Sequence, residues 1–358
     1  MKKTFYMIMA LAAATAGFTS CNEEWEDEQF RQLVSLKAEP NSSGVTDTYV
    51  RFNAEGEKVY ELPVILSGST MSTQDRVVRI AVDPDTLAQL NIERYGTSER
   101  NDAIKYKQLD AQYFHFPETV TIPAGECVTT LPITFTLGGE NNANPLDMGE
   151  KWILPLTVVD GEESYEANPR KHYRKALLNI QPFNDYSGVY GGTQFFITSQ
   201  FDSNGDGVVD GNDAAAGAAS TENEHRAYVY DDQTVFFYGG RINSEDINRN
   251  LYKVYVRFSK DGFEGTEDDF RKPLEIWSDN PENNFKVTSD ISYYTKTEEF
   301  DEQEPYTKYI YINLYFSYEF EDYTSIPGVR QKFTCDGVLS LMRELNTLIP
   351  DEDQQIQW

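Results

Sequence analysis

Residues 202–213 have the sequence DSNGDGVVDGND, in which oxygen-bearing side chains recur at nearly alternate positions. A tightly wound loop of this kind brings its donors to one point, and Ca²⁺ takes about six to eight oxygen ligands. The glycine at the sixth position of the loop permits the required sharp turn. The stretch therefore predicts a calcium site formed by Asp202, Asn204, Asp206, the backbone carbonyl of Val208, Asp210 and Asp213.

The expected role of this ion is structural. Four of the predicted ligands are carboxylates, which would repel one another without a cation. Paired EF-hands usually have Glu at the twelfth position, whereas Asp213 at that position resembles the single loops of dockerin-type extracellular proteins. The alternative is an acidic, glycine-rich turn that only binds water.

A second set of residues suits contact with sugars. Residues 309–320 alternate as a strand does, and one face, which consists of Ile310, Ile312, Leu314, Phe316, Tyr318 and Phe320, is predicted to be core. The opposite face carries Tyr309, Tyr311, Asn313 and Tyr315. Aromatic rings suit the apolar faces of sugars, and neighbouring polar groups bind the hydroxyls. These tyrosines could instead pack under a loop or between domains, and Trp277 is an isolated alternative contact.

Known catalytic motifs are missing from the sequence. There is no GxSxG, no HExxH and no phosphate-binding P-loop. His115, His172 and His225 are scattered and lack an adjacent nucleophile motif. We therefore predict no catalytic residue, and the alternative is a glycosidase, whose two carboxylates cannot be picked from 59 acidic residues without geometry.

Composition limits the class of protein. The 358 residues are enough for two domains, and 59 acidic against 31 basic residues give a net charge of −28, which disfavours nucleic-acid binding. The 23 Tyr and 21 Phe favour β structure. Three Cys and three His exclude a disulfide scaffold and a zinc cluster. Because Cys127 and Cys335 are assigned to different domains, we expect two buried free thiols.

The N-terminus is predicted to be an export signal and a lipid anchor. Residues 1–20 combine Lys2 and Lys3 with a charge-free stretch that is too short to cross a bilayer, as in a secretory signal peptide. Small residues then precede Cys21 as in a bacterial lipobox, although Phe18 replaces the usual aliphatic residue. Residues 21–29 form an acidic tether. We expect acyl chains on Cys21 to hold the protein in the outer membrane, facing the exterior; the alternative is ordinary cleavage beside an accidental cysteine.

The rest of the chain is predicted to be all-β. Short runs rich in β-branched residues and Leu, bounded by Gly, Pro, Asn or Asp, recur throughout. Residues 30–183 are expected to form an immunoglobulin-like β-sandwich. Residues 186–358 are expected to form a second β-rich domain, a sandwich or barrel-like, that contains the calcium loop. In three strands a proline follows Leu, at Pro63, Pro132 and Pro155, which predicts edges, strand starts or bulges.

The order of these features resembles a family of two-domain Bacteroidetes-type surface lipoproteins with uncharacterised domains. The resemblance rests on the lipobox, the acidic tether, the Leu-Pro strands, VTIPAGE at 120–126, YSGVY at 186–190 and IPDEDQQIQW at 349–358. Such proteins accompany starch-utilisation-type (Sus-like) glycan uptake systems. The resemblance implies a non-enzymatic protein that captures polysaccharide or oligosaccharide beside a TonB-dependent transporter. The alternatives are a structural scaffold subunit of the uptake complex and a glycoside hydrolase.

Overall fold

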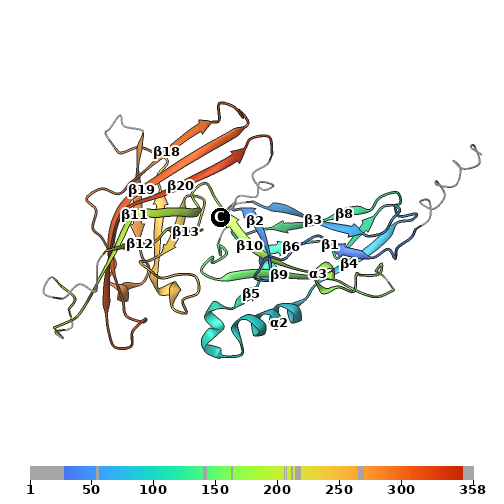
Figure 1. Ribbon diagram of the computed structural model, residues 1–358, viewed down its shortest axis with the longest axis horizontal. Coiled ribbons are helices and arrows are strands. Elements are labelled where there is room, and N and C mark those ends of the chain that lie inside the picture. The colour runs from blue at the N-terminus through green and yellow to red at the C-terminus, as the bar shows by residue number, and fades with distance from the viewer. Residues whose placement is uncertain are drawn as a thin grey trace, which may run out of the picture.

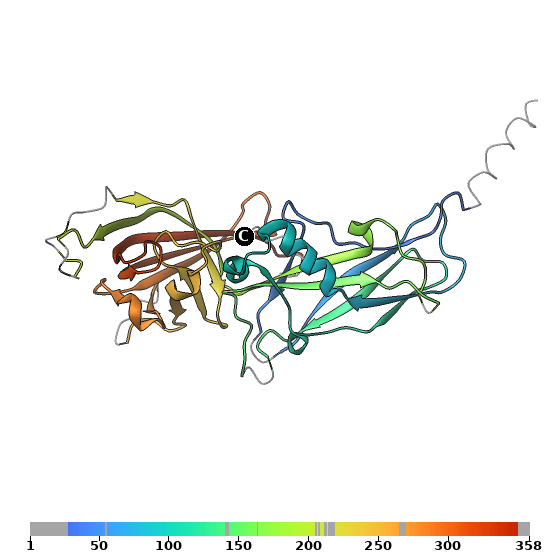
Figure 2. The same cartoon turned by 90° about the horizontal axis from the view of Figure 1, so that it is seen from below.

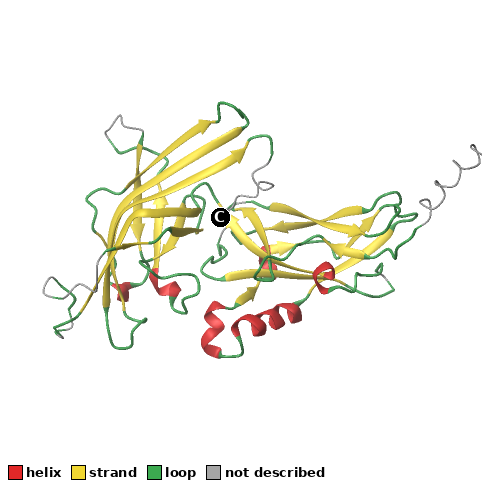
Figure 3. Ribbon diagram, viewed as in Figure 1, coloured by secondary structure: helices red, strands yellow, loops and turns green. Residues whose placement is uncertain are grey.

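The computed structural model describes residues 28–349, apart from residues 54–55, 140–142, 163, 205, 207, 211–212, 214–218 and 265–269. The chain forms two β-rich domains that lie end to end, a sandwich followed by a barrel (Figure 1). A view from below shows the same elongated arrangement (Figure 2). Strands dominate both domains, and the longest described helix lies beside the sandwich (Figure 3). No described helix is long and apolar enough to span a bilayer.

The sandwich consists of two facing sheets. Its strands are β1 (Val34–Leu36), β2 (Thr46–Arg51), β3 (Lys58–Leu66), β4 (Arg76–Val82), β5 (Tyr106–Gln108), β6 (Phe114–His115), β7 (Thr119–Ile122), β8 (Val128–Phe135), β9 (Lys151–Val158) and β10 (Lys175–Phe183). One sheet has the order β1-β3-β8-β6, and the other has the order β2-β10-β9-β4-β7 with β5 added to β9. Alternate side chains along each strand point to opposite faces. Leu62, Val64 and Leu66 of β3 therefore all enter the core between the sheets.

Four prolines lie inside strands of this domain, and three of them, Pro63, Pro132 and Pro155, follow a leucine. Each of these three lies beyond the point where pairing with one neighbouring strand stops. Pro63 of β3 lies past the end of its pairing with β1, and Pro132 of β8 lies past the end of its pairing with β6. Pro155 of β9 lies past the end of its pairing with β4. A proline cannot donate to a sheet, so it is tolerated where a neighbouring strand has ended. Each of the three prolines therefore occupies a local edge of its sheet.

Helix α2 (Pro84–Tyr95) packs on one side of the sandwich. Asp83 caps its N-terminus by accepting the N–H of Thr86, Pro84 occupies the first turn, and Gly96 follows its C-terminus with a φ of 71°. Leu87 packs with Tyr106 and other buried residues of the sheet. The other helical turns are α3 (Lys171–Arg174), η1 (Glu99–Ile104), η2 (Ala111–Tyr113), η4 (Arg249–Tyr252) and η5 (Pro281–Asn283).

The second domain is a closed barrel. Its strands are β11 (Gly188–Phe201), β13 (Glu224–Val229), β14 (Thr234–Tyr238), β15 (Lys253–Phe258), β16 (Arg271–Trp277), β18 (Tyr293–Phe300), β19 (Thr307–Asp322) and β20 (Gln331–Asn346). They pair antiparallel in this order, and β20 pairs back onto β11. These strands therefore close into a ring, and none of them is left as an open edge. Two short strands, β12 (Ser220–Thr221) and β17 (Lys286–Val287), add to β11 and β19. The prediction of two β-rich domains is confirmed, and the second takes the barrel form.

A continuous apolar core joins the two domains. Side chains that point out of the barrel, including Phe236, Tyr238 and Tyr255, belong to the same buried cluster as the core of the sandwich. The linker between β10 and β11 is also held in place. Buried Arg343 of β20 donates hydrogen bonds to the carbonyl oxygens of Asn184, at 3.3 Å, and Ser187, at 2.6 Å. The two domains therefore share one fixed junction.

Candidate functional site

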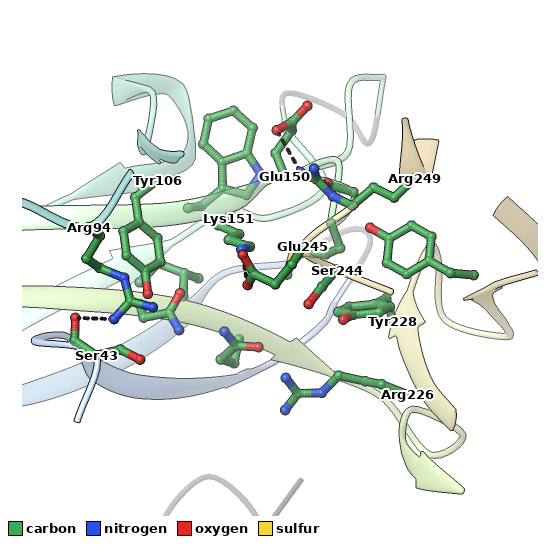
Figure 4. Close-up of a pocket in the computed structure, with 17 residues that line it drawn as sticks. Ser43, Arg94, Tyr106, Glu150, Lys151, Arg226, Tyr228, Ser244, Glu245 and Arg249 are labelled. Carbon is green, nitrogen blue, oxygen red and sulfur yellow. Dashed lines mark hydrogen bonds and ion pairs between the residues drawn. The ribbon is translucent and has the colours of Figure 1, made fainter. Parts of the chain in front are cut away.

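A cavity of about 170 Å³ lies between the sandwich and the barrel (Figure 4). The sandwich contributes the last turn of α2, strand β5, the start of β9 and the middle of β10, and the barrel contributes β13, β14 and residues 244–249. Aromatic and charged side chains share its wall. The aromatic and charged residues of this wall are Arg94, Tyr106, Glu150, Lys151, Trp152, Arg226, Tyr228, Tyr238, Glu245 and Arg249.

Hydrogen bonds fix the aromatic rings on the sandwich side. The side chain of Asn91 donates to the backbone carbonyl of Tyr106 at 2.8 Å and accepts the N–H of Tyr106 at 2.9 Å, which ties β5 to α2. The ring of Tyr106 meets Tyr95 edge to face, with centroids 5.9 Å apart. The indole N–H of Trp152 donates to the carbonyl of Asp147 at 2.7 Å. These rings are thus already in place for a ligand.

The barrel side of the cavity is built on a stack of aromatic rings. Tyr228 of β13 stacks on Phe236 of β14 with centroids 5.2 Å apart and lies 5.4 Å from Tyr238. Burial raises the pKa of both Tyr228 and Tyr238, so their hydroxyls stay protonated at physiological pH. The wall therefore offers apolar ring faces together with neutral hydroxyl donors.

A buried arginine closes the cavity at the domain junction. Arg249 of η4 is 1% exposed, and its guanidinium donates to the carbonyl oxygen of Gly149 at 2.8 and 3.1 Å. It also lies 3.4 Å from a carboxylate oxygen of Glu150. Nearby, Lys253 of the barrel pairs with Asp147 of the sandwich at 2.8 Å. Buried charges with several partners hold a fixed geometry, so the cavity wall is rigid here.

A second cavity of about 310 Å³ adjoins the first. The two share Arg226, Tyr228, Tyr238 and Ser244 as lining residues, so they lie side by side, and we call the pair the interdomain groove although only the barrel lines the second cavity. The second cavity also has Glu222 and Glu224 in its wall. A ligand that occupied both cavities would pass the four residues that they share.

The charged groups of the smaller cavity favour binding over acid–base chemistry. A glycosidase needs two carboxyl groups free to act as acid and as base or nucleophile. In the smaller cavity Glu245 pairs with Lys151 at 2.6 Å, and Glu150 pairs with Lys107 at 3.0 Å as well as contacting Arg249. Its carboxylates are thus engaged in ion pairs, while ring faces and hydrogen-bond donors remain available.

The tyrosine face predicted for sugar contact lies outside the barrel on β19. The alternation is confirmed, since Ile312 and Leu314 point into the barrel and Tyr309, Tyr311, Asn313 and Tyr315 are half-buried on its outer surface. Tyr315 stacks on Tyr293 of β18 at 4.6 Å, and Asn313 accepts a hydrogen bond from Ser340 at 2.7 Å. These four residues line neither cavity of the interdomain groove. Their contact with sugar stays a prediction.

Trp277, the other predicted contact, lies at the end of β16. Its ring stacks on Tyr255 with centroids 5.2 Å apart, and the guanidinium carbon of Arg257 lies 5.1 Å from its centroid. Its indole N–H donates to Asp279 at 3.1 Å. Trp277 packs against the core that joins the domains, which leaves less of its ring for a sugar.

The predicted calcium loop follows β11, at the end of the barrel far from the sandwich (Figure 1). Asp213 of its twelfth position accepts the backbone N–H groups of Ser203 at 2.7 Å and Asp210 at 2.9 Å, so the two ends of the loop lie together. Val209, at the eighth position, is buried, with 8% of its surface exposed. Asp202, Asn204, Asp206 and Val208 lie along the same turn, yet among the described residues no three acidic, His or Cys groups converge on one point. The donors suit Ca²⁺, and the binding of the ion stays a prediction.

The chain enters the sandwich at the end opposite the barrel (Figure 1). Glu28 fixes this entry, because its carboxylate accepts the N–H groups of Ser69 at 2.8 Å and Thr70 at 3.1 Å. These backbone hydrogen bonds, with that from Phe30, hold the pKa of Glu28 well below its usual range. Cys21, the predicted lipid anchor, and the signal peptide lie outside the described residues.

Comparison with known proteins gives matches along most of the chain. A family model described as a domain of unknown function (DUF4973) matches residues 25–162, and a model of a C-terminal domain matches residues 174–340. A Bacteroides ovatus protein of unknown function is 38% identical, with a TM-score of 0.74, over 91% of this chain and 100% of the other. An auxiliary nutrient binding protein from Bacteroides thetaiotaomicron is 34% identical, with a TM-score of 0.71, over 88% of this chain and 96% of the other. The chain belongs to this family of Bacteroides proteins.

Two further points complete the comparison with this Bacteroides family. A search among curated proteins gives no match. The second family model includes β10, yet β10 pairs with β2 and β9 and is thus part of the sandwich.

Sequence reasoning did not find the interdomain groove. Trp152 stands at the start of an apolar strand, and the structure packs it, half-buried, against the core while it also lines the cavity. Arg226 and Tyr228 do carry a local signal, because they alternate with buried His225 and Ala227 along β13. That pattern predicts that the two side chains point out of the barrel. Only the packing of the two domains shows that they line a cavity against the sandwich.

Proposed function

We propose that this protein binds an oligosaccharide or polysaccharide nutrient in its interdomain groove and does not cleave it. The observation that carries the proposal is the preformed groove, in which Tyr106, Trp152 and Tyr228 stand beside hydrogen-bonding groups. Rings of this kind cover the apolar faces of sugars, and polar neighbours bind the hydroxyls. The smaller cavity, at about 170 Å³, is below the ~300–1,000 Å³ typical of drug-sized ligands and suits a single sugar ring.

The proposed setting is the outer face of the outer membrane. Acyl chains on Cys21 would anchor the protein, and a TonB-dependent transporter would be its partner. The lipobox and acidic tether support this setting, as does a relative that is described as an auxiliary nutrient binding protein. Because the chain enters the sandwich far from the barrel, the groove would stand away from the lipid surface. Ligand held there would be more concentrated near the transporter.

Calcium is proposed to brace the barrel without touching the ligand. The loop at residues 202–213 supplies oxygen donors of the type that Ca²⁺ prefers. Its two ends already meet through Asp213, and Val209 within it is buried. The loop lies at the far end of the barrel from the sandwich, so the ion would act on stability and not on the groove.

Calorimetric titration with a panel of plant, host and microbial oligosaccharides tests the function. We expect at least one member to bind the mature protein, with Tyr228→Ala weakening that binding at least tenfold. Tyr311→Ala is the matched control, because it removes a half-buried ring of the same type from the outer face of β19. If Tyr311→Ala alone weakens binding, the sugar is bound by the outer tyrosines and the groove is not the site.

The two alternatives predict different results in the same assays. A scaffold subunit would co-purify with a transporter and bind no member of the panel. A hydrolase would release reducing ends over hours. Binding without new reducing ends is the result expected here.

A further inference from the structure

The charge balance of the smaller cavity is opposite to that of the whole chain. The chain has 59 acidic and 31 basic residues, whereas the cavity wall contains the cations Arg94, Lys151, Arg226 and Arg249 and only the carboxylates Glu150 and Glu245. A local excess of cations in an acidic protein requires a specific arrangement of side chains. The excess points to a ligand that carries negative charge.

Both carboxylates of the cavity already have partners. Glu245 pairs with Lys151 at 2.6 Å, and Glu150 lies 3.0 Å from Lys107 and 3.4 Å from Arg249. Arg249 is also occupied by the carbonyl oxygen of Gly149. The charges of Lys151 and Arg249 are therefore largely neutralised within the protein.

Arg94 and Arg226 are left as the cations that can meet a ligand. Within the described residues neither makes an ion pair: Arg94 donates to the carbonyl of Ser43 at 3.3 Å, and the guanidinium carbon of Arg226 lies 5.8 Å from the ring centroid of Tyr228. Glu245 is near enough to act electrostatically on Arg94, but its ion pair is with Lys151. Figure 4 shows the two arginines entering the cavity from opposite sides, Arg94 at the end of α2 and Arg226 on β13.

Each of these side chains suits an anionic group. A guanidinium offers a planar set of donors that matches a carboxylate or a sulfate-type oxyanion, and half-buried Arg226 is less screened by water than a surface residue. The adjoining cavity has Glu222 and Glu224 in its wall, which would repel a second anion and accept hydrogen bonds from neutral sugar hydroxyls. The smaller cavity of the groove is thus cationic, and the adjoining cavity is acidic.

We propose that the ligand is an acidic oligosaccharide, with a carboxylate or sulfate on one sugar bound by Arg226 on the barrel side of the smaller cavity, opposite Arg94, and with neutral sugars in the adjoining cavity. This inference rests on the proposed function, because it names the class of glycan that the groove selects. It distinguishes that glycan from neutral polymers such as starch and from chains that carry a charge on every sugar.

Matched pairs of oligosaccharides test the proposal by calorimetry on the mature protein. One pair is xylotetraose with and without a single glucuronic acid, and another is a galactose oligosaccharide with and without one sulfate ester. We expect the charged member of a pair to bind at least tenfold more tightly than its neutral mate, and which pair shows the preference identifies carboxylate or sulfate. The preference should shrink as salt is raised.

Arg226→Gln should weaken binding of the charged member at least tenfold and weaken binding of the neutral mate much less, so that the preference is lost. The matched control is Arg257→Gln, which removes an exposed barrel arginine that pairs with Glu275. Neutral mates that bind as well as charged ones, with no effect of Arg226→Gln, would overturn the acidic ligand while leaving glycan capture intact. Failure of every saccharide in the wider panel to bind would instead reject the proposed function and this inference with it.

Discussion

The guanidinium of Arg249 in the barrel donates two hydrogen bonds, of 2.8 and 3.1 Å, to the carbonyl oxygen of Gly149 in the sandwich. Arg249 is almost fully buried, so this contact crosses the junction out of reach of water. It borders the cavity proposed to bind the ligand. The relative position of the two domains and the shape of the site therefore depend on the same side chain.

Replacing this arginine should weaken the junction strongly. Arg249→Met keeps much of the apolar volume but leaves the carbonyl of Gly149 without its side-chain donor and takes one of two cations from the carboxylate of Glu150. Breaking a buried charged contact costs about 3–5 kcal/mol. Denaturant unfolding should show a loss of that size, whereas Arg257→Met, which removes an exposed ion pair, should cost under about 1 kcal/mol. Equal losses for the two variants would contradict a special role for Arg249.

The stability of the protein should depend on pH through His225. Burial lowers the pKa of this histidine from 6.5 to about 4, and its Nε2 atom has no hydrogen-bond partner among the described residues. The unfolded chain takes up a proton below pH ~6.5, whereas the folded chain does so only near pH 4. Stability is therefore complete above pH ~6.5 and falls by up to ~3 kcal/mol as the pH drops to 4.

Denaturant melts between pH 7 and 4 measure this dependence. His225→Phe keeps a ring against Phe195 but cannot take up a proton, so its stability should change less over this range. Substitution of exposed His115 by Asn should leave the dependence as it is in the parent protein. Parallel curves for the parent and His225→Phe would show that His225 is not the group responsible.

The two remaining thiols should react at very different rates. Cys335 is fully buried, and burial raises its pKa to about 12, so it holds almost no thiolate at neutral pH. Cys127 is only partly buried, which corrects the expectation that both thiols are buried. With Cys21 changed to Ser, a disulfide reagent should modify one thiol in the native protein and the second only on unfolding. If the Cys127→Ser variant is still labelled rapidly in its native state, Cys127 is not the accessible thiol.

Calcium should stabilise the barrel through the loop at residues 202–213. At about 100 times the Kd, an ion that binds only the folded state adds ~2.7 kcal/mol. A chelator should therefore lower the melting temperature, and Asp202→Ala should remove that response. Exposed Asp232, outside the loop, provides the control, since Asp232→Ala should still respond. A melting curve that the chelator leaves unchanged in the parent protein would remove Ca²⁺ from this account.

The features that sequence predicts best here are set by near neighbours along the chain. The inward face of β19 follows from strict alternation at Ile310, Ile312 and Leu314. Closure of the barrel depends instead on pairs such as Ile197 with Cys335, which no local pattern specifies.

The binding groove is harder still to predict. Arg94 and Arg226 lie far apart in the sequence, on different domains, and share a cavity only because the domains pack together. The tyrosines of β19 show a clear periodic signal, yet that signal reports a strand surface and not a cavity.

A crystal structure of the protein with a bound acidic oligosaccharide is the most direct test of the account. We predict density for a sugar ring in the interdomain cavity, packed against Tyr106 or Trp152, with its anionic group within hydrogen-bond distance of Arg226. A sugar bound only to Tyr309, Tyr311 and Tyr315 on the outside of the barrel, with the interdomain cavity free of sugar, would contradict it.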